Sequence, residues 1–401
     1  MSSPTDFGDQ RRAGLPQGIV VVIASFLPIL AIVALAPAVP RMMEHFAGVP
    51  GASLWVPLAV TAPGLMVALL SPAMGWLVDR YGRSRLLVVA TAIYGLVGIA
   101  PVFIDGLPAL FASRLLLGVC EAAILTVTNT LVGDYFEEDR RRFWLTVQSA
   151  AQPFFGVSLL VLSGTLSGMG WNIPFLVYAC AIPIALAMAF LLFEPAKRSP
   201  ALAGLASERF PTRHVLITSG VTLLASSLYY VYIVQVGLLF PGVSVTSPDT
   251  IGMLIGLANV GVFFGGLLFK PASARLGTGM QVGIFFALLG LGLLGIGASH
   301  SPAQMTVFCA VQQLGAGLCI PTLLLWTMRG LSDENRGRGM GIWSCAFFVG
   351  QFVSPALVSL VTLFSHALSR TFVVMGVGGI ILAVILGAAL NAGARQARVT
   401  G

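Results

Sequence analysis

Charged residues are scarce in this chain. Asp, Glu, Lys and Arg together make up 9% of its 401 residues, against roughly 25% in a typical soluble domain. Apolar residues make up 57%, and the mean hydropathy is +0.93. The 46 glycines and 23 prolines do not indicate disorder, because membrane helices tolerate both residues. The composition therefore predicts an integral membrane protein.

The sequence also lacks the motifs of several function classes. Its five cysteines all fall in apolar stretches without a CxxC pair, so we interpret them as packing residues. The four histidines lie at span ends or in loops, and there is no nucleophile elbow, metal-ligand cluster or phosphate-binding glycine loop. These absences argue against a metal site, a membrane-embedded enzyme and an ATP-driven pump. The net charge of +7 comes from scattered basic residues, which argues against a nucleic-acid partner.

Twelve apolar stretches approach the length of about 20 residues that a helix needs to cross the hydrocarbon core. The first is full length and has no small-residue cleavage signature, so we interpret it as a span and not as a signal peptide. The sequence thus predicts an all-α membrane protein with both termini on one side. The stretches begin near Gly18, Leu54, Leu86, Phe111, Phe143, Ile173, Val215, Ile251, Met280, Met305, Met340 and Phe372.

Basic residues are distributed very unevenly over the connections between these spans. With the N-terminus inside, 19 of the 22 Lys and Arg residues lie on the cytoplasmic side. The other three are Arg41 and Arg370 in outer loops and Arg114 within a span. Because cytoplasmic loops are enriched in Lys and Arg, this pattern predicts that both termini are cytoplasmic.

Two short sequence patterns that occur twice indicate that the chain contains an internal repeat. Residues 138–141 (EDRR) after span four return as 333–336 (DENR) after span ten, an offset of 195 residues. The Gly-x-x-x-charged pattern at 75–79 after span two returns at 266–270 after span eight, an offset of 191. Near-equal offsets suggest duplication of a six-helix unit. We therefore expect tails at 1–17 and 391–401, helix bundles at 18–193 and 215–390, and a cytoplasmic linker at 194–214.

The connection between spans two and three, residues 75–85, reads GWLVDRYGRSR. It resembles the signature loop of the major facilitator superfamily, which is a glycine, three residues, Asp-Arg-x-Gly and then basic residues. Ser84 is the one departure, since a second basic residue is common there. The resemblance covers essentially the whole chain. It implies a secondary transporter of twelve helices in two pseudo-symmetric bundles that works by alternating access.

The same resemblance implies that this loop forms a cytoplasmic gate. Asp79 would meet the positive N-terminal end of span eleven, and Arg83 would pair with Asp134 at the inner end of span four. The alternative is that these charges are solvated and only obey the charge rule for cytoplasmic loops. The expected gate residues are Gly75, Asp79, Arg80, Gly82, Arg83 and Asp134.

Span four carries an acid and a base inside the membrane. Arg114, Gly118 and Glu121 stand at i, i+4 and i+7, which is one helix face. Each charge at mid-bilayer costs on the order of 2.5–3.5 kcal/mol, so such residues usually face the bundle interior and serve a function. The Arg-x-x-x-Gly pattern is similar to one found in proton-coupled members of the superfamily. We predict that Glu121 exchanges protons beside Arg114; a purely structural ion pair is the alternative.

Polar side chains on other spans are candidates for solute binding. The resemblance implies that spans one, four, seven and ten line the cavity. Hydroxyl and amide groups there suit a neutral or amphipathic organic solute, although hydrogen bonding between helices is an alternative role. The candidates are Tyr229, Tyr230, Tyr232 and Gln235 in span seven, Gln312 and Gln313 in span ten, Gln148 and Gln152 in span five, and Trp343 in span eleven.

Span five reads QPFFG at 152–156 and lacks the spaced glycines ending in Gly-Pro of many drug/proton antiporters. Overall resemblance to bacterial efflux permeases still favours proton-coupled efflux across a bacterial inner membrane. Two alternatives stay open: proton-coupled uptake of an organic anion held by Arg114, and a membrane sensor that transports nothing. We expect a monomer whose partners are a small solute, protons and membrane lipids, with no cofactor.

Overall fold

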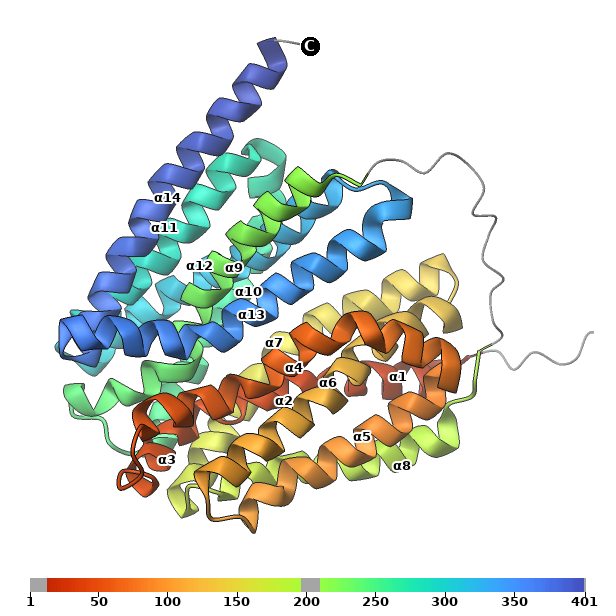
Figure 1. Cartoon of the computed structure of the whole chain (residues 1–401), viewed down its shortest axis with the longest axis horizontal. Helices are drawn as coiled ribbons and strands as arrows, with labels where there is room; N and C mark the ends of the chain where they lie inside the picture. Colours follow the sequence, from red (N-terminus) through yellow and green to blue (C-terminus); the bar gives the residue numbers. More distant parts are fainter. Residues whose placement is uncertain (1–12, 196–209, 400–401) are drawn as a thin grey trace, which may run out of the picture.

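The structure is a computed structural model that describes residues 13–195 and 210–399, and within these ranges the chain is helical apart from short connections (Figure 1). Twelve of its helical segments are long and apolar enough to cross a membrane. This confirms the predicted fold class and number of spans. The expected linker at 194–214 and the tail at 1–17 lie largely outside the described residues.

The first six spans pack together, with α4 and α5 against α6 and α5 against α8. Span one consists of four short pieces, and span six begins with a 3₁₀ helix. The elements are α1 (Leu15–Ala24), α2 (Leu27–Val33), η1 (Ala36–Ala38), α3 (Val39–His45), α4 (Ala52–Tyr81), α5 (Arg83–Ile99), η2 (Ala100–Val102), α6 (Leu107–Tyr135), α7 (Glu138–Met169), η3 (Ile173–Cys180) and α8 (Ala181–Leu191).

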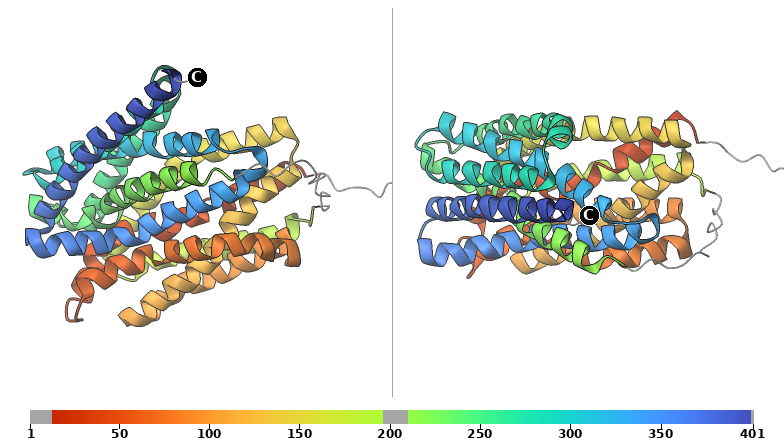
Figure 2. Two further views of the ribbon diagram at one scale, coloured as in Figure 1. Left: turned by 45° about the horizontal axis from the view of Figure 1, so that its top comes forward. Right: turned by 90° about the horizontal axis from the view of Figure 1, so that it is seen from above.

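The last six spans form a second group, in which α9 packs on α13, α12 on α10 and α11, and α11 on α14. The two groups lie side by side in both views (Figures 1 and 2). The elements are α9 (Thr212–Gln235), η4 (Val236–Leu238), η5 (Phe240–Val243), α10 (Pro248–Arg275), α11 (Thr278–Gly297), α12 (Pro302–Arg329), α13 (Asp333–Ser365) and α14 (Leu368–Val399).

Two spans differ from the sequence-based expectation. Span one, expected as one continuous stretch beginning near Gly18, extends from Leu15 to His45 in four pieces, and Arg41 lies in α3 instead of an outer loop. Its prolines explain the breaks, because proline has no N–H to donate and clashes with the preceding helical turn. The other span, α14, continues to Val399 through most of the expected tail, since that segment is rich in the helix formers Ala, Arg and Gln.

Each group contains six spans, so the first residue of α1, the last of α8, the first of α9 and the last of α14 lie at one end of the molecule. We call this the linker end and the opposite one the distal end. Between the groups, α4 packs on α13 and α7 on α10 (Figure 1). A Cβ atom on Gly164 of α7 would lie 2.7 Å from the Pro248 carbonyl oxygen and 3.0 Å from Gly252 Cα. These glycines bring the two groups into backbone contact near the distal end.

Candidate functional site

Helix α6 carries two charged residues in the middle of its membrane span, Arg114 and Glu121, and both are buried. Arg114 is 1% exposed and Glu121 is 2% exposed. Between them, a Cβ on Gly118 would lie 2.5 Å from the Pro63 carbonyl oxygen of α4. Glycine at this position therefore lets α6 lie directly on the α4 backbone, with both charges inside the first helix group.

Arg114 is held by the broken first span. Its Nη2 donates to the Ala31 carbonyl oxygen at 2.6 Å and to the Tyr178 hydroxyl at 2.9 Å. The guanidinium also lies over the rings of Tyr178 and Phe175, at 5.1 Å and 5.8 Å from their centroids. Ala31 is in the last turn of α2, where carbonyl groups lack helical partners and a cation is favourable. Arg114 thus caps the C-terminal end of α2.

Other side chains donate to three further carbonyl groups of this span. The Tyr178 hydroxyl of η3 donates to the Leu30 carbonyl at 2.9 Å, and the Tyr94 hydroxyl of α5 donates to that of Leu27 at 2.6 Å. The Ser163 hydroxyl of α7 donates to the carbonyl of Ala34. Backbone groups in a bilayer must find partners within the protein. Helices α5, α6, α7 and η3 supply these partners.

Glu121 and Arg114 do not form an ion pair: no N···O distance within 4.0 Å joins them, whereas four such pairs occur elsewhere in the described ranges. Within the part of the chain that the structure describes, the Oε2 atom of Glu121 and the Nε and Nη1 atoms of Arg114 are buried without a hydrogen-bond partner. The carboxyl group is close enough for electrostatic interaction with Tyr94, Tyr178 and, in the second helix group, Tyr230. Glu121 therefore interacts electrostatically with tyrosines of both helix groups.

The expected gate residues lie around the turn between α4 and α5. Arg83 and Asp134 form an ion pair that ties α5 to the last turn of α6. Both belong to the first helix group, so the pair itself does not bridge the groups. Gly82, at φ 89°, makes the turn in a backbone region that favours glycine. Arg80 lies 5.8 Å over the Tyr81 ring. The surroundings of Gly75 and the side chain of Asp79 are outside the described part.

Glu194, which follows α8, contacts this turn and was not among the predicted site residues. Its carboxylate accepts hydrogen bonds from the backbone N–H groups of Arg83 at 2.6 Å and Ser84 at 3.0 Å, and so caps the N-terminus of α5. The Ser84 hydroxyl donates to the Phe193 carbonyl at 2.6 Å. This partly buried bond gives serine a structural role at the position where a basic residue is common. The only signal in the sequence was an acid placed directly after span six.

The candidate solute-binding residues fall into three classes of exposure. Tyr232, Gln235, Gln312, Gln313 and Trp343 are buried, Tyr229, Tyr230 and Gln148 are half-buried, and Gln152 is exposed on α7.

Hydrogen bonding separates the two glutamines of α12. Gln313 Nε2 donates to Asn259 Oδ1 of α10 at 2.9 Å, so this amide links two helices of the second group. The amide of Gln312 has no partner among the described residues. The Cβ and backbone of Gln312 pack against Gly292 of α11. Asn259 was not predicted, because a single amide in an apolar span has no distinguishing pattern.

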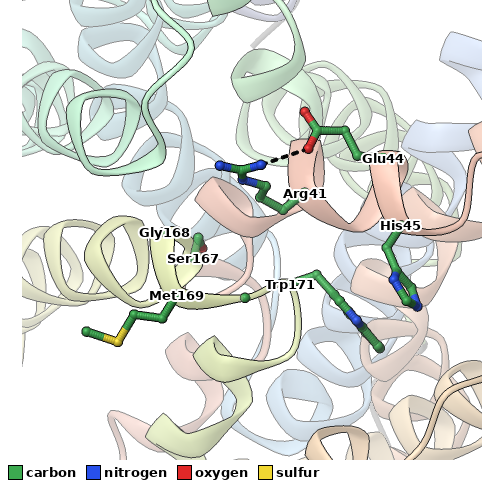
Figure 3. Close-up of a pocket in the computed structure, with 8 residues that line it drawn as sticks. Arg41, Glu44, His45, Ser167, Gly168, Met169 and Trp171 are labelled. Atoms are coloured by element: carbon green, nitrogen blue, oxygen red, sulfur yellow. Dashed lines mark hydrogen bonds and ion pairs between the residues drawn. The ribbon is translucent and has the colours of Figure 1, made fainter.

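A separate pocket opens at the distal end and contains none of the predicted site residues (Figure 3). Arg41 and Glu44 of α3 form an ion pair at 3.1 Å on its rim. The His45 ring stacks on Trp171 with centroids 4.6 Å apart, and its Nε2 lies 2.6 Å from Asp105 Oδ1 in the connection between α5 and α6. These contacts fasten the distal end of span one to its neighbours.

Comparison with known proteins places this architecture in a family. The model of the Major Facilitator Superfamily matches residues 21–245 and 216–398. The chain is 24% identical over 344 residues to the bacillibactin exporter of Bacillus subtilis, covering 80% of this chain and 83% of that protein. It is 25% identical over 391 residues to the 4-hydroxybenzoate transporter PcaK of Pseudomonas aeruginosa, covering 84% of each.

A more local match joins the chain to the multidrug efflux pump LfrA of Mycolicibacterium smegmatis. The two are 32% identical over 188 residues, which span 43% of this chain and about a third of LfrA (35%). Among solved structures, a bacterial homolog of the human lysosomal transporter Spinster, in an inward-facing and occupied conformation, superposes with a TM-score of 0.75 at 14% identity, covering 94% and 96% of the two chains. Twelve spans, a shared fold and a family match over nearly the whole sequence show that this chain belongs to the Major Facilitator Superfamily.

Proposed function

We propose that this transporter exports a small organic solute in exchange for protons, by alternating access, across a bacterial inner membrane. The observation that carries the proposal is Glu121, a carboxyl group buried inside a membrane span without an ion-pair partner. An ionised carboxylate in such a place has a large desolvation cost, which protonation removes. When water reaches the site, the ionised form is favoured again. Glu121 is therefore suited to take up and release a proton.

Arg114 supports this role because its guanidinium group already interacts with a carbonyl group, a hydroxyl group and two aromatic rings. Its guanidinium caps α2 and lies over two aromatic rings, and it makes no direct contact that would neutralise Glu121. The names of two relatives, an efflux pump and an exporter, support export as the direction.

Uptake of an organic anion is the second candidate function. The unpartnered Nε and Nη1 donors of Arg114 favour it, since carboxylates bind guanidinium groups well. The 4-hydroxybenzoate transporter among the relatives shows that an aromatic acid is a solute within this family.

Flux in proteoliposomes separates the two candidates. Antiport predicts that a solute selected by ligand-induced thermal shift accumulates in the lumen when the lumen is acidic, because outgoing protons drive solute inward regardless of protein orientation. Symport predicts accumulation only when the outside is acidic. Accumulation under neither gradient, with a solute that binds, would contradict proton coupling altogether.

For the orientation, we propose that the linker end faces the cytoplasm and that the structure is inward-facing. The backbone contacts of Gly164 and Gly252 close the distal side, and the solved Spinster homolog is also inward-facing. In a cysteine-free background, Arg41→Cys and Arg370→Cys should react with an impermeant thiol reagent in intact cells, whereas Arg141→Cys should react only after lysis. All three side chains are exposed. The reverse pattern of labelling would overturn the orientation.

A further inference from the structure

A row of aromatic rings crosses from α9 to α13, which run side by side in the second helix group (Figure 1). The Tyr229 and Tyr230 rings are 4.9 Å apart in an edge-to-face arrangement. The Tyr230 and Phe347 rings pack edge-to-face with their centroids 5.8 Å apart. Phe347 stacks on Trp343 at a centroid distance of 5.8 Å, with 20° between the ring planes. We call Tyr229, Tyr230, Phe347 and Trp343 the aromatic row.

This row lies on α9 and α13, which both contact α4 of the first helix group. Tyr230 is the member within electrostatic range of Glu121, which belongs to the first helix group. Tyr229, Tyr230 and Phe347 are only half-buried, so parts of their rings are not covered by other side chains. The row is therefore a partly uncovered aromatic surface on the two helices that contact α4 across the boundary between the groups.

Trp343 adds an unused hydrogen-bond donor to the row. The residue is 8% exposed, and its Nε1 is buried without a partner in the segments that the structure describes. A buried indole N–H normally finds an acceptor. A donor left unpaired beside half-covered rings is the arrangement expected of a binding site whose ligand brings the acceptor.

We propose that the aromatic row binds a planar aromatic ring of the solute, and that Trp343 Nε1 donates a hydrogen bond to an acceptor on it. The inference rests on the proposed transport function and names its class of solute. A flat ring can stack on these faces or meet them edge-on at the separations that aromatic pairs prefer, whereas a saturated ring of equal size only buries apolar area. Selectivity for aromatic over saturated rings is the property that distinguishes this site from ordinary apolar packing.

Calorimetric titration of the purified protein in detergent tests the proposal with 2-naphthoate and decahydro-2-naphthoate, two acids of equal charge and carbon skeleton. The aromatic acid should bind about 2- to 10-fold more tightly. Phe347→Leu should remove this difference and Phe347→Tyr should keep it. The matched control Phe190→Leu changes a ring that is 81% exposed on α8 and should leave the selectivity unchanged.

The hydrogen bond from Trp343 Nε1 has a separate test. Trp343→Phe should weaken binding of 2-naphthoate by about 2- to 10-fold. It should leave 2-naphthylmethylamine unaffected, because an ammonium group offers no acceptor. Absence of 2-naphthoate binding, equal affinity for the two acids, or selectivity that survives in Phe347→Leu would overturn the proposal. Binding in detergent needs no proton gradient, so retained selectivity with absent flux would instead count against the transport mechanism.

Discussion

Glu121→Gln is expected to abolish proton-driven accumulation of solute while solute exchange without a gradient continues. Glutamine resembles the protonated carboxyl group in size and hydrogen bonding but carries no proton to release. The carrier would then still bind solute and reorient, yet it could not couple this movement to protons. Accumulation under a pH gradient and exchange between equal solute concentrations, measured on the same proteoliposomes, separate the two activities.

The same variant distinguishes coupling from a structural role. Glu121 has no ion-pair contact with Arg114, so its replacement by an isosteric amide should change the thermal stability little. A structural pair would instead lose about 3–5 kcal/mol on removal of one partner. If Glu121→Gln retains full accumulation, the coupling role assigned to it is wrong, and Asp134 becomes the next residue to test.

Arg114→Ala should produce the largest loss of stability among single substitutions in the first helix group. It removes the hydrogen bonds to the Ala31 carbonyl and the Tyr178 hydroxyl and the stacking on two aromatic rings. Charge-assisted hydrogen bonds of this kind make the expected loss on the order of 2–4 kcal/mol. The free energy of unfolding, measured by titration with a denaturing detergent, reports the change.

Two further variants sharpen this prediction. Arg114→Lys keeps a cation near the end of α2 but lacks the planar group that stacks, so an intermediate loss is expected. Arg41→Ala removes an exposed arginine paired only with Glu44, and should cost well under about 1 kcal/mol. Equal stability of Arg114→Ala and Arg41→Ala would contradict the capping role.

Much of the fold was predictable because hydropathy acts locally. Each span is recognisable from its own residues, and the basic residues of the connections check the count independently. The helical period also placed Arg114 and Glu121 on one buried face of α6. The two side chains do not form an ion pair, since seven residues correspond to about 10.5 Å along a helix.

What escaped prediction depends on the backbone of distant segments. The partner of Arg114 is a carbonyl group of span one, and every residue has such a group, so no sequence pattern marks it. The sequence does indicate the breaks in that span through Pro28, Pro37 and Pro40, but a count of apolar residues does not use these positions. The capping role of Glu194 likewise depends on the meeting of two turns 110 residues apart.

The interrupted first span has a consequence for biogenesis. Span one is made first, yet the donors for its free carbonyl groups come from Tyr94, Arg114, Ser163 and Tyr178, the last of which lies in span six. An unpaired carbonyl in lipid costs several kcal/mol. We therefore expect the first span to reach its final form only after the sixth has been synthesised, so that the N-terminal half matures as one unit.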